Sequence, residues 1–150
     1  MKNLYEAATT EEVKKRIAQL RPDSTRQWGK MNPGQAMAHC AVAMEWAVGD
    51  SFPPRMFIGR IFGPLIKSKL ITNDEPMRRN APTTKSLVMK DDHDLAKEQE
   101  RLRALVERFA TSGPGGCTRH PHTFFGQLTP KEWATLMYKH IDHHLRQFGT

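Results

Sequence analysis

The chain has 150 residues, a length typical of one folded domain, so we expect a single domain over residues 1–150. Hydrophobic residues make up 38% of it, and no apolar run reaches the roughly 20 residues that a membrane-spanning helix needs. This composition excludes a membrane-embedded chain. The start lacks a secretory signal pattern and the two cysteines form no CxxC pair, so we expect a cytoplasmic protein with free thiols at Cys40 and Cys117.

The formal net charge of +7 is concentrated in the middle of the chain. Only Asp74 and Glu75 oppose the basic residues there, which are Arg55, Arg60, Lys67, Lys69, Arg78, Arg79, Lys85 and Lys90. A positive surface favours an anionic ligand, although the same charge also fits a solvated surface without a ligand. We expect no specific nucleic-acid binding, because no predicted helix carries a basic reading face and no aromatic platform is interleaved with the charge.

Two helices are predicted in the first third of the chain. Thr9-Thr10-Glu11-Glu12 has the form of a capping box, and an apolar repeat follows it until Pro22. The second helix has Asn32 as its N-cap, proline at the first helical position and Gln35 three residues past the cap. It continues to Val48, before Gly49.

About forty residues separate this helix from the next, which indicates a long crossover and allows the two helices to run parallel. Gly59, Gly63 and Pro64 limit any helix inside the crossover to a short or kinked one. We expect its apolar stripe to pack across the end of a helical bundle, the alternatives being a membrane surface or a second subunit. The stripe consists of Phe57, Ile58, Ile61, Phe62, Leu65 and Ile66.

Two further helices are predicted in the last third. One follows the acidic residues Asp91, Asp92 and Asp94 and ends before Gly113, with an apolar seam at Leu95, Leu102, Val106 and Phe109. The other begins with the capping box Thr129-Pro130-Lys131-Glu132 and stops at Gly149. Four helices with one apolar stripe each predict an all-α four-helix bundle with a long crossover between helices two and three.

Three histidines fall on the apolar faces of these helices. His140 and His144 share one face of the last helix, four residues apart, and His39 lies on the core-facing stripe of the second helix. Buried imidazoles are costly without partners, and a shared metal ion would be one. The residues leave a second interpretation equally open, in which each histidine is a hydrogen-bonded core residue.

Other polar residues have less certain places. Gln35 and Gln147 share the faces of the three histidines and are candidates for hydrogen bonds to their rings, and Gln99 is a candidate for substrate contact. An equally open interpretation is that all three are polar residues at the solvated end of the bundle. We expect Asp142 to point away from the site, and His143 to lie at the edge of the apolar stripe and to face solvent or orient a neighbouring residue. The pattern does not place His93, His120 or His122.

Together these residues resemble a known family. The last helix is similar to the closing helix of the DinB/YfiT-like superfamily of bacterial-type metalloenzymes, and more narrowly to a branch of it classed as a domain of unknown function. The resemblance covers essentially the whole chain. It rests on Trp28-Gly29, Met31-Asn-Pro-Gly-Gln35, Ala38-His39, His120-Pro121, Phe125-Gly126, Leu128-Thr129-Pro130, Trp133 and Lys139-His-Ile-Asp-His-His-Leu-Arg-Gln-Phe-Gly149.

The resemblance implies a four-helix bundle whose metal ligands are His39, His140 and His144. The metal would be zinc, nickel, iron or manganese, since imidazole suits several divalent ions. It implies a thiol-dependent transferase that uses a low-molecular-weight thiol, or a hydrolase, acting on a small anionic substrate drawn by the basic crossover, and it allows a homodimer. Cys40 and Ala41 depart from the bulkier residues usual after the first histidine. The alternative is a non-catalytic bundle that binds a partner through its crossover.

Overall fold

The computed structural model describes all of residues 1–150 and contains five α-helices, two short 3-10 turns and no strand. The 3-10 turns are Lys85–Leu87 and Pro114–Gly116. The all-helical class is therefore confirmed, with one more helix than the four expected. The helices are α1 (Ala7–Gln19), α2 (Pro33–Val48), α3 (Phe57–Thr72), α4 (Leu95–Ser112) and α5 (Pro130–Gln147).

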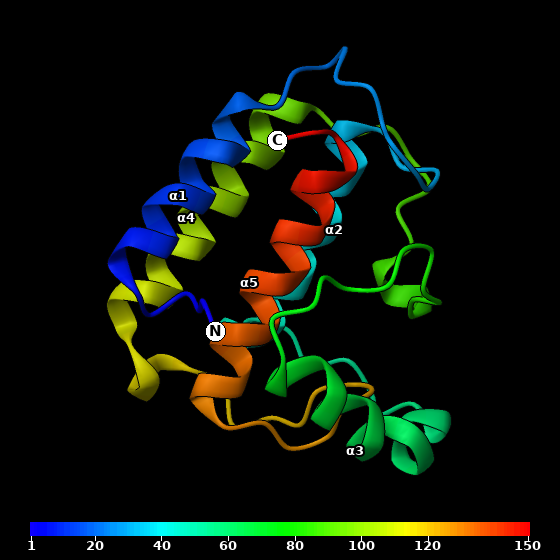
Figure 1. Ribbon diagram of the computed structural model, residues 1–150, viewed down its shortest axis with the longest axis vertical. Helices are drawn as coiled ribbons and strands as arrows, with labels where there is room; N and C mark the ends of the chain where they lie inside the picture. The colour runs from blue at the N-terminus through cyan, green and yellow to red at the C-terminus, as the bar shows by residue number, and fades with distance from the viewer.

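Four of the helices enclose one hydrophobic core. Helix α2 packs against α4 and α5, and α1 packs against the same two helices. In Figure 1, α1 and α5 run upward while α2 and α4 run downward, so α2 and α4 are parallel, as the long crossover predicts. Helix α3 belongs to the crossover and lies at the lower end, against α5. The largest fully buried side chains include Trp133, Phe109, Leu4, Ile17, Met37 and Met44.

Two of the predicted capping boxes are present. At the start of α2, the Asn32 side chain accepts from the Gln35 amide at 2.8 Å while the Gln35 side chain accepts from the Asn32 amide at 3.0 Å. Thr129 and Glu132 make the same reciprocal pair at the start of α5. These bonds satisfy amides that a helix start otherwise leaves without partners.

The capping box predicted for α1 is wrong. The helix begins at Ala7 with Glu6 as N-cap, so both threonines lie inside its first turns and are buried. Their hydroxyls have other acceptors, since Thr10 donates to the Leu4 carbonyl at 2.9 Å and Thr9 to the Glu6 carboxylate at 3.0 Å. The hydroxyl of Thr10 thus anchors the N-terminal segment instead of capping a helix.

Helix α3 differs most from expectation. It runs for 16 residues through Pro64, and its buried positions are Gly59, Gly63 and Ile71. Its apolar stripe stays exposed, so the expected packing of that stripe across the bundle end is wrong. A Cβ on Gly63 would lie 2.2 Å from the Phe124 carbonyl oxygen, so this face of α3 packs backbone to backbone. None of the helices has both the length and the apolar character needed to cross a bilayer.

Candidate metal centre

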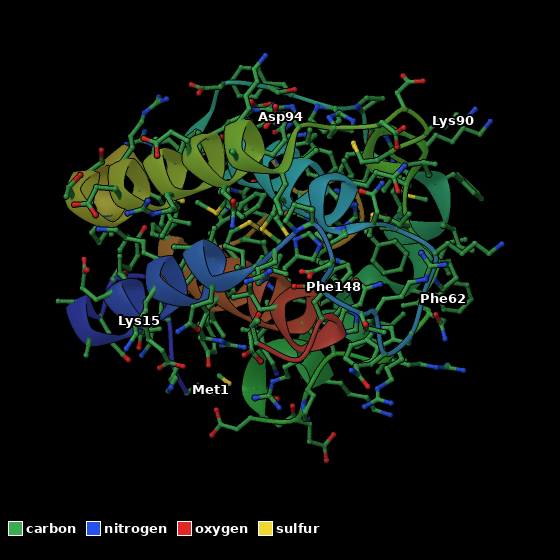
Figure 2. All side chains as sticks on the ribbon, turned by 90° about the horizontal axis from the view of Figure 1, so that it is seen from above. Met1, Lys15, Phe62, Lys90, Asp94 and Phe148 are labelled. Carbon is green, nitrogen blue, oxygen red and sulfur yellow. The ribbon has the colours of Figure 1, made fainter.

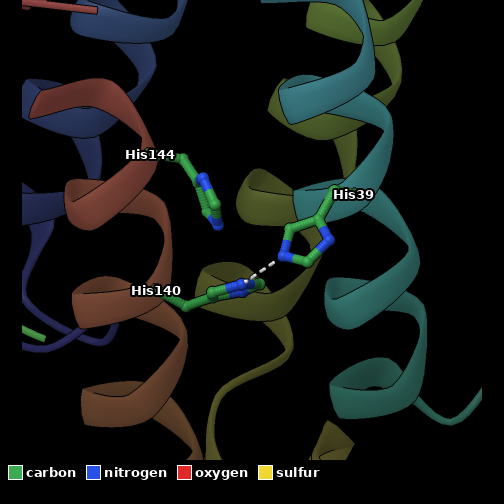
Figure 3. A group of neighbouring side chains, drawn as sticks. All are labelled: His39, His140 and His144. Atoms are coloured by element: carbon green, nitrogen blue, oxygen red, sulfur yellow. Dashed lines mark hydrogen bonds between the residues drawn. The ribbon is translucent and has the colours of Figure 1, made fainter. Parts of the chain in front are cut away.

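Three histidines from two helices converge in the core. His39 projects from α2, and His140 and His144 project from α5 one turn apart, with their rings turned toward one another (Figure 3). The Nε2 atoms of His39 and His140 are 2.8 Å apart, and the group offers one ligand atom per residue, all within 4.8 Å of one another. His39 and His144 are buried, whereas His140 keeps part of its surface exposed. The structure therefore brings together the three histidines that the sequence singles out.

A backbone carbonyl orients the first of these rings. His39 Nδ1 lies 2.7 Å from the Leu87 carbonyl oxygen, in the short 3-10 turn Lys85–Leu87 of the crossover. Because a carbonyl only accepts, Nδ1 must carry the proton and donate it. Nε2 of His39 is then the unprotonated nitrogen, and it accepts the 2.8 Å hydrogen bond from His140 Nε2.

A side-chain amide orients the third ring in the same way. His144 Nδ1 donates to Gln147 Oε1 at 2.9 Å, and Gln147 Nε2 donates to the Trp28 carbonyl at 2.8 Å, which fixes the amide orientation. Gly29 leaves room for this amide, since a Cβ there would lie 2.5 Å from Gln147 Nε2. Nε2 of His144 is consequently also the unprotonated nitrogen.

Burial keeps all three imidazoles neutral. It lowers the pKa of His39 and brings the pKa of His144 to about 3. The pKa of His140 falls well below its ordinary value, first through burial and then through the neighbouring His39 and His144. Three uncharged rings with converging nitrogens are the state in which imidazoles bind a metal ion, because protonated rings cannot.

The spacing of these nitrogens fits a metal ion. Bonds of 2.0–2.1 Å at tetrahedral angles place ligand nitrogens about 3.3 Å apart. The 2.8 Å contact and the 4.8 Å limit of the group bracket that value. No carboxylate or thiolate belongs to the group, so an ion held there would keep its full positive charge. The three histidines could therefore hold a divalent ion and leave a position open for a further ligand.

The remaining histidines lie outside this group. His143 is partly exposed and packs beside Trp28, with ring centroids 5.4 Å apart. His93 pairs with Glu98 at the start of α4, and His120 bonds the neighbouring Pro121 carbonyl. His122 accepts from the Phe124 and Phe125 amides, and burial lowers its pKa to about 4.

Two of the glutamines have structural roles. Gln35 is used entirely by the α2 cap and by a bond to the Asp91 carbonyl, so its expected contact with a ligand ring is wrong. Gln99 donates to the carbonyls of Ile17 and Leu20 at the end of α1, which leaves the expected substrate contact without support. Only Gln147 makes the predicted hydrogen bond to an imidazole.

The structure also shows where Asp142 and the two cysteines lie. Asp142 faces away from the histidines, as expected, and pairs with Arg16 and Arg146. Both thiols are free and buried, and burial raises the pKa of each, so neither is a ready nucleophile.

Two connecting segments contribute groups that the sequence did not reveal, the one before α2 and the crossover after it. Leu87 and Trp28 act through their backbone carbonyls, which every residue possesses, so no side-chain pattern indicates them. Arg79 stacks over the Trp28 ring at 4.1 Å, beside His143. The pair Trp28-Gly29 before α2 is the one part of the sequence that indicates such a contact, because glycine permits the close approach of Gln147.

A comparison with protein families gives a match over nearly the whole chain. The model of a family described as "Protein of unknown function (DUF1569)" matches residues 3–150. No curated protein and no solved structure matches the chain.

Proposed function

The chain belongs to the DUF1569 family of unknown function, and from its site we propose that it is a divalent-metal enzyme whose ion is held by His39, His140 and His144. The observation that carries this proposal is the fixed orientation of two of the rings. Leu87 and Gln147 each accept the Nδ1 proton of a buried histidine and direct its Nε2 lone pair to a common point. Such outer hydrogen bonds are a regular feature of protein metal sites.

Three protein ligands suit a catalytic site better than a structural one, since structural sites close all four positions. A divalent ion supplies Lewis acidity there, which lowers the pKa of a water or thiol. Zinc, nickel, iron and manganese are all compatible with imidazole. The chain's own contribution is to keep the three imidazoles neutral and to fix the orientation of His39 and His144.

The reaction class rests on the resemblance to the DinB/YfiT-like superfamily. In this proposal α1, α2, α4 and α5 are the four-helix bundle of that superfamily, and α3 is an addition in its crossover. The resemblance favours a transferase that activates a low-molecular-weight thiol, with hydrolysis as the other reaction of the same site. Fold-level analogy does not choose between them.

An anionic substrate is supported by the position of Arg79. Its guanidinium stacks on Trp28, whose carbonyl holds Gln147, and its side chain is exposed. It forms no ion pair with an acidic side chain, and it is connected to His144 through Trp28 and Gln147. A free guanidinium at this place can bind a carboxylate or phosphate of a substrate.

The test combines metal loading with two assays. Protein loaded separately with zinc, nickel, iron(II) or manganese is assayed for thiol consumption with an electrophilic substrate and for hydrolysis of an activated ester. We expect one of these activities with at least one ion, its loss in His140→Ala, and its retention in His143→Ala. If no ion binds to the wild-type protein, the proposal fails.

The alternative function is a non-catalytic bundle that binds a partner through the basic crossover. It is favoured by the crossover's free positive charge, because of its eight basic residues only Lys67 forms an ion pair. Under this alternative, His140→Ala has no effect in cells that depend on the protein, whereas neutralising Arg78 and Arg79 abolishes function. The metal proposal predicts the loss of function in His140→Ala.

A further inference from the structure

The exposed side of α3 is a continuous apolar surface. Phe57, Ile58, Ile61, Phe62, Leu65 and Ile66 are 43% to 77% exposed. They follow one another at steps of one and three residues, which places them on one half of the helix. Figure 2 shows Phe62 toward the edge of the molecule. Because one aromatic side chain carries about 200 Å² of surface, these six reach the few hundred Å² at which a patch marks an interaction site.

The orientation of α3 is fixed by contacts on its other side. Its glycines lie against the Phe124 backbone, where a Cβ on Gly59 would be 2.5 Å from the carbonyl oxygen. Lys67 pairs with Glu132 at 2.9 Å. The buried Lys139 of α5 donates to the Leu70 and Asn73 carbonyls at the end of α3. Rotating the helix to bury its apolar half would break all three contacts, so the exposure is built into the fold.

Free positive charge accompanies the apolar half. Arg60 and Lys69 are exposed and lie on α3 itself, and Arg55 precedes it. None of the three forms an ion pair, and no acidic residue occurs between residues 51 and 73. At 100° per residue, Arg60 lies on the side opposite the stripe and Lys69 within the stripe's half. An apolar helix face combined with basic residues on the same helix is typical of helices that lie in the interface of a membrane.

We propose that α3 docks this protein on an anionic phospholipid surface, with its apolar half among the lipid chains and Arg60 and Lys69 at the headgroups. The charge argues against a second copy of the chain as the occupant. A two-fold contact through the stripe would bury Lys69, which lies in the same half of the helix, in both copies, and the apolar face offers no acid to offset this charge. An anionic lipid surface complements both the charge and the apolar half.

The test is sedimentation of the full-length protein with vesicles. Vesicles of phosphatidylcholine alone are compared with vesicles containing 30% phosphatidylglycerol, a composition chosen for the assay as a roughly physiological surface charge. We expect binding to the anionic vesicles only, weakened by high salt. Arg60→Gln/Lys69→Gln should lower binding at least tenfold, since each basic residue near such a surface contributes a factor of about five.

A second pair of variants tests whether the stripe itself binds the vesicles, or whether any exposed apolar side chain does. Ile61→Ser/Leu65→Ser should lower vesicle binding at least tenfold, whereas Phe52→Ser, which changes an equally exposed side chain outside α3, should not. Melting temperatures of all variants establish that each is folded. The proposal is overturned if the wild type does not bind anionic vesicles or if the stripe variant binds as well as the wild type. It is equally overturned if the wild type is a dimer that the stripe variant dissociates, or if only an acidic protein partner, and no vesicle, binds the stripe.

Discussion

Helices α5 and α3 lie in contact but distribute their side chains in opposite ways. Helix α5 buries two imidazoles, His140 and His144, beside a third from α2. Helix α3 buries two glycines and leaves two phenylalanines and four aliphatic side chains exposed. Burying imidazoles and exposing large apolar side chains both cost free energy, since polar groups prefer water and apolar groups avoid it. Such costs are typical of sites that bind something.

The two helices differ in what offsets the cost within the chain. In α5, the Nδ1 proton of His144 has an acceptor, His140 is hydrogen-bonded to His39, and one ring nitrogen of each histidine lies within 4.8 Å of the others. In α3, nothing in the chain covers the apolar half. The buried histidines therefore have partners inside the chain and could hold a metal ion, whereas the apolar half of α3 has no partner inside the chain.

Acid should cause the largest loss of stability, because it favours protonation of the buried histidines His144 and His122. The folded-state pKa is about 3 for His144 and about 4 for His122, both below the ordinary 6.5. Below pH 6.5 the unfolded chain therefore binds protons that the fold excludes, so the stability contribution present above that pH is lost as the pH falls. Between pH 7.5 and 5 each histidine costs about 2 kcal/mol, and the pair about 4.

Urea unfolding of the metal-free protein at the two pH values measures this loss. His93→Gln, which changes a partly exposed histidine, should leave the pH dependence unchanged, whereas His144→Gln should reduce it. Equal stability at pH 5 and 7.5 would contradict the buried, neutral state of these rings.

Loss of one ligand should be the next largest effect. His140→Ala removes one of three nitrogens, and we expect zinc affinity to fall at least 100-fold, beyond the usual cost of losing an outer hydrogen bond. Competition with a chromogenic chelator measures the affinity. His143→Ala is the matched control, because it removes an adjacent imidazole of the same helix that lies outside the group. A similar loss in both variants would contradict the assignment of the ligands.

Removal of the hydrogen bond that orients His144 should have a smaller effect. Gln147→Leu deletes the acceptor of the Nδ1 proton, and we expect zinc affinity to fall about 10–100-fold. Gln147→Glu keeps an acceptor at that position and should recover part of the affinity. If Gln147→Leu binds zinc as tightly as the wild type, the amide does not orient the ring in solution.

On α3 the two faces should respond oppositely to substitution. Gly63→Ala places a Cβ 2.2 Å from a carbonyl oxygen and should cost about 1 to 3 kcal/mol of unfolding free energy. Gly115→Ala, with open space around it, is its control. Ile61→Ser on the exposed half should change stability by less than about 0.5 kcal/mol. Denaturant unfolding checks all three, and a large loss in Ile61→Ser would mean that the stripe is buried.

The features that could be predicted from the sequence depend on residues close together in the chain. The starts of α2 and α5 follow from reciprocal caps, and the shared face of His140 and His144 follows from helical periodicity. The start of α1 could not be predicted in this way, because Thr10 donates to Leu4 instead of capping. A capping pattern shows that a hydroxyl is available, and the tertiary structure decides which group it binds.

What could not be predicted depends on contacts between distant segments. Gly63 indicates a weak helix when taken alone, yet it stabilises α3 by allowing contact with the backbone of Phe124. The carbonyl of Leu87 orients His39 from a crossover segment with no distinguishing side chain. Gln35 and Gln147 both share a face with a histidine, but only the structure shows that the first is taken up by the cap of α2.

The central claim is that His39, His140 and His144 together hold one divalent ion. Equilibrium dialysis against zinc, nickel, iron(II) and manganese, followed by elemental analysis of the protein, tests it most directly. The account predicts one ion per chain for the wild-type protein with at least one of these metals, a raised melting temperature on binding, and neither effect in the variant with all three histidines changed to alanine. A wild-type protein that binds none of them, or a triple variant that binds as much metal, would contradict it.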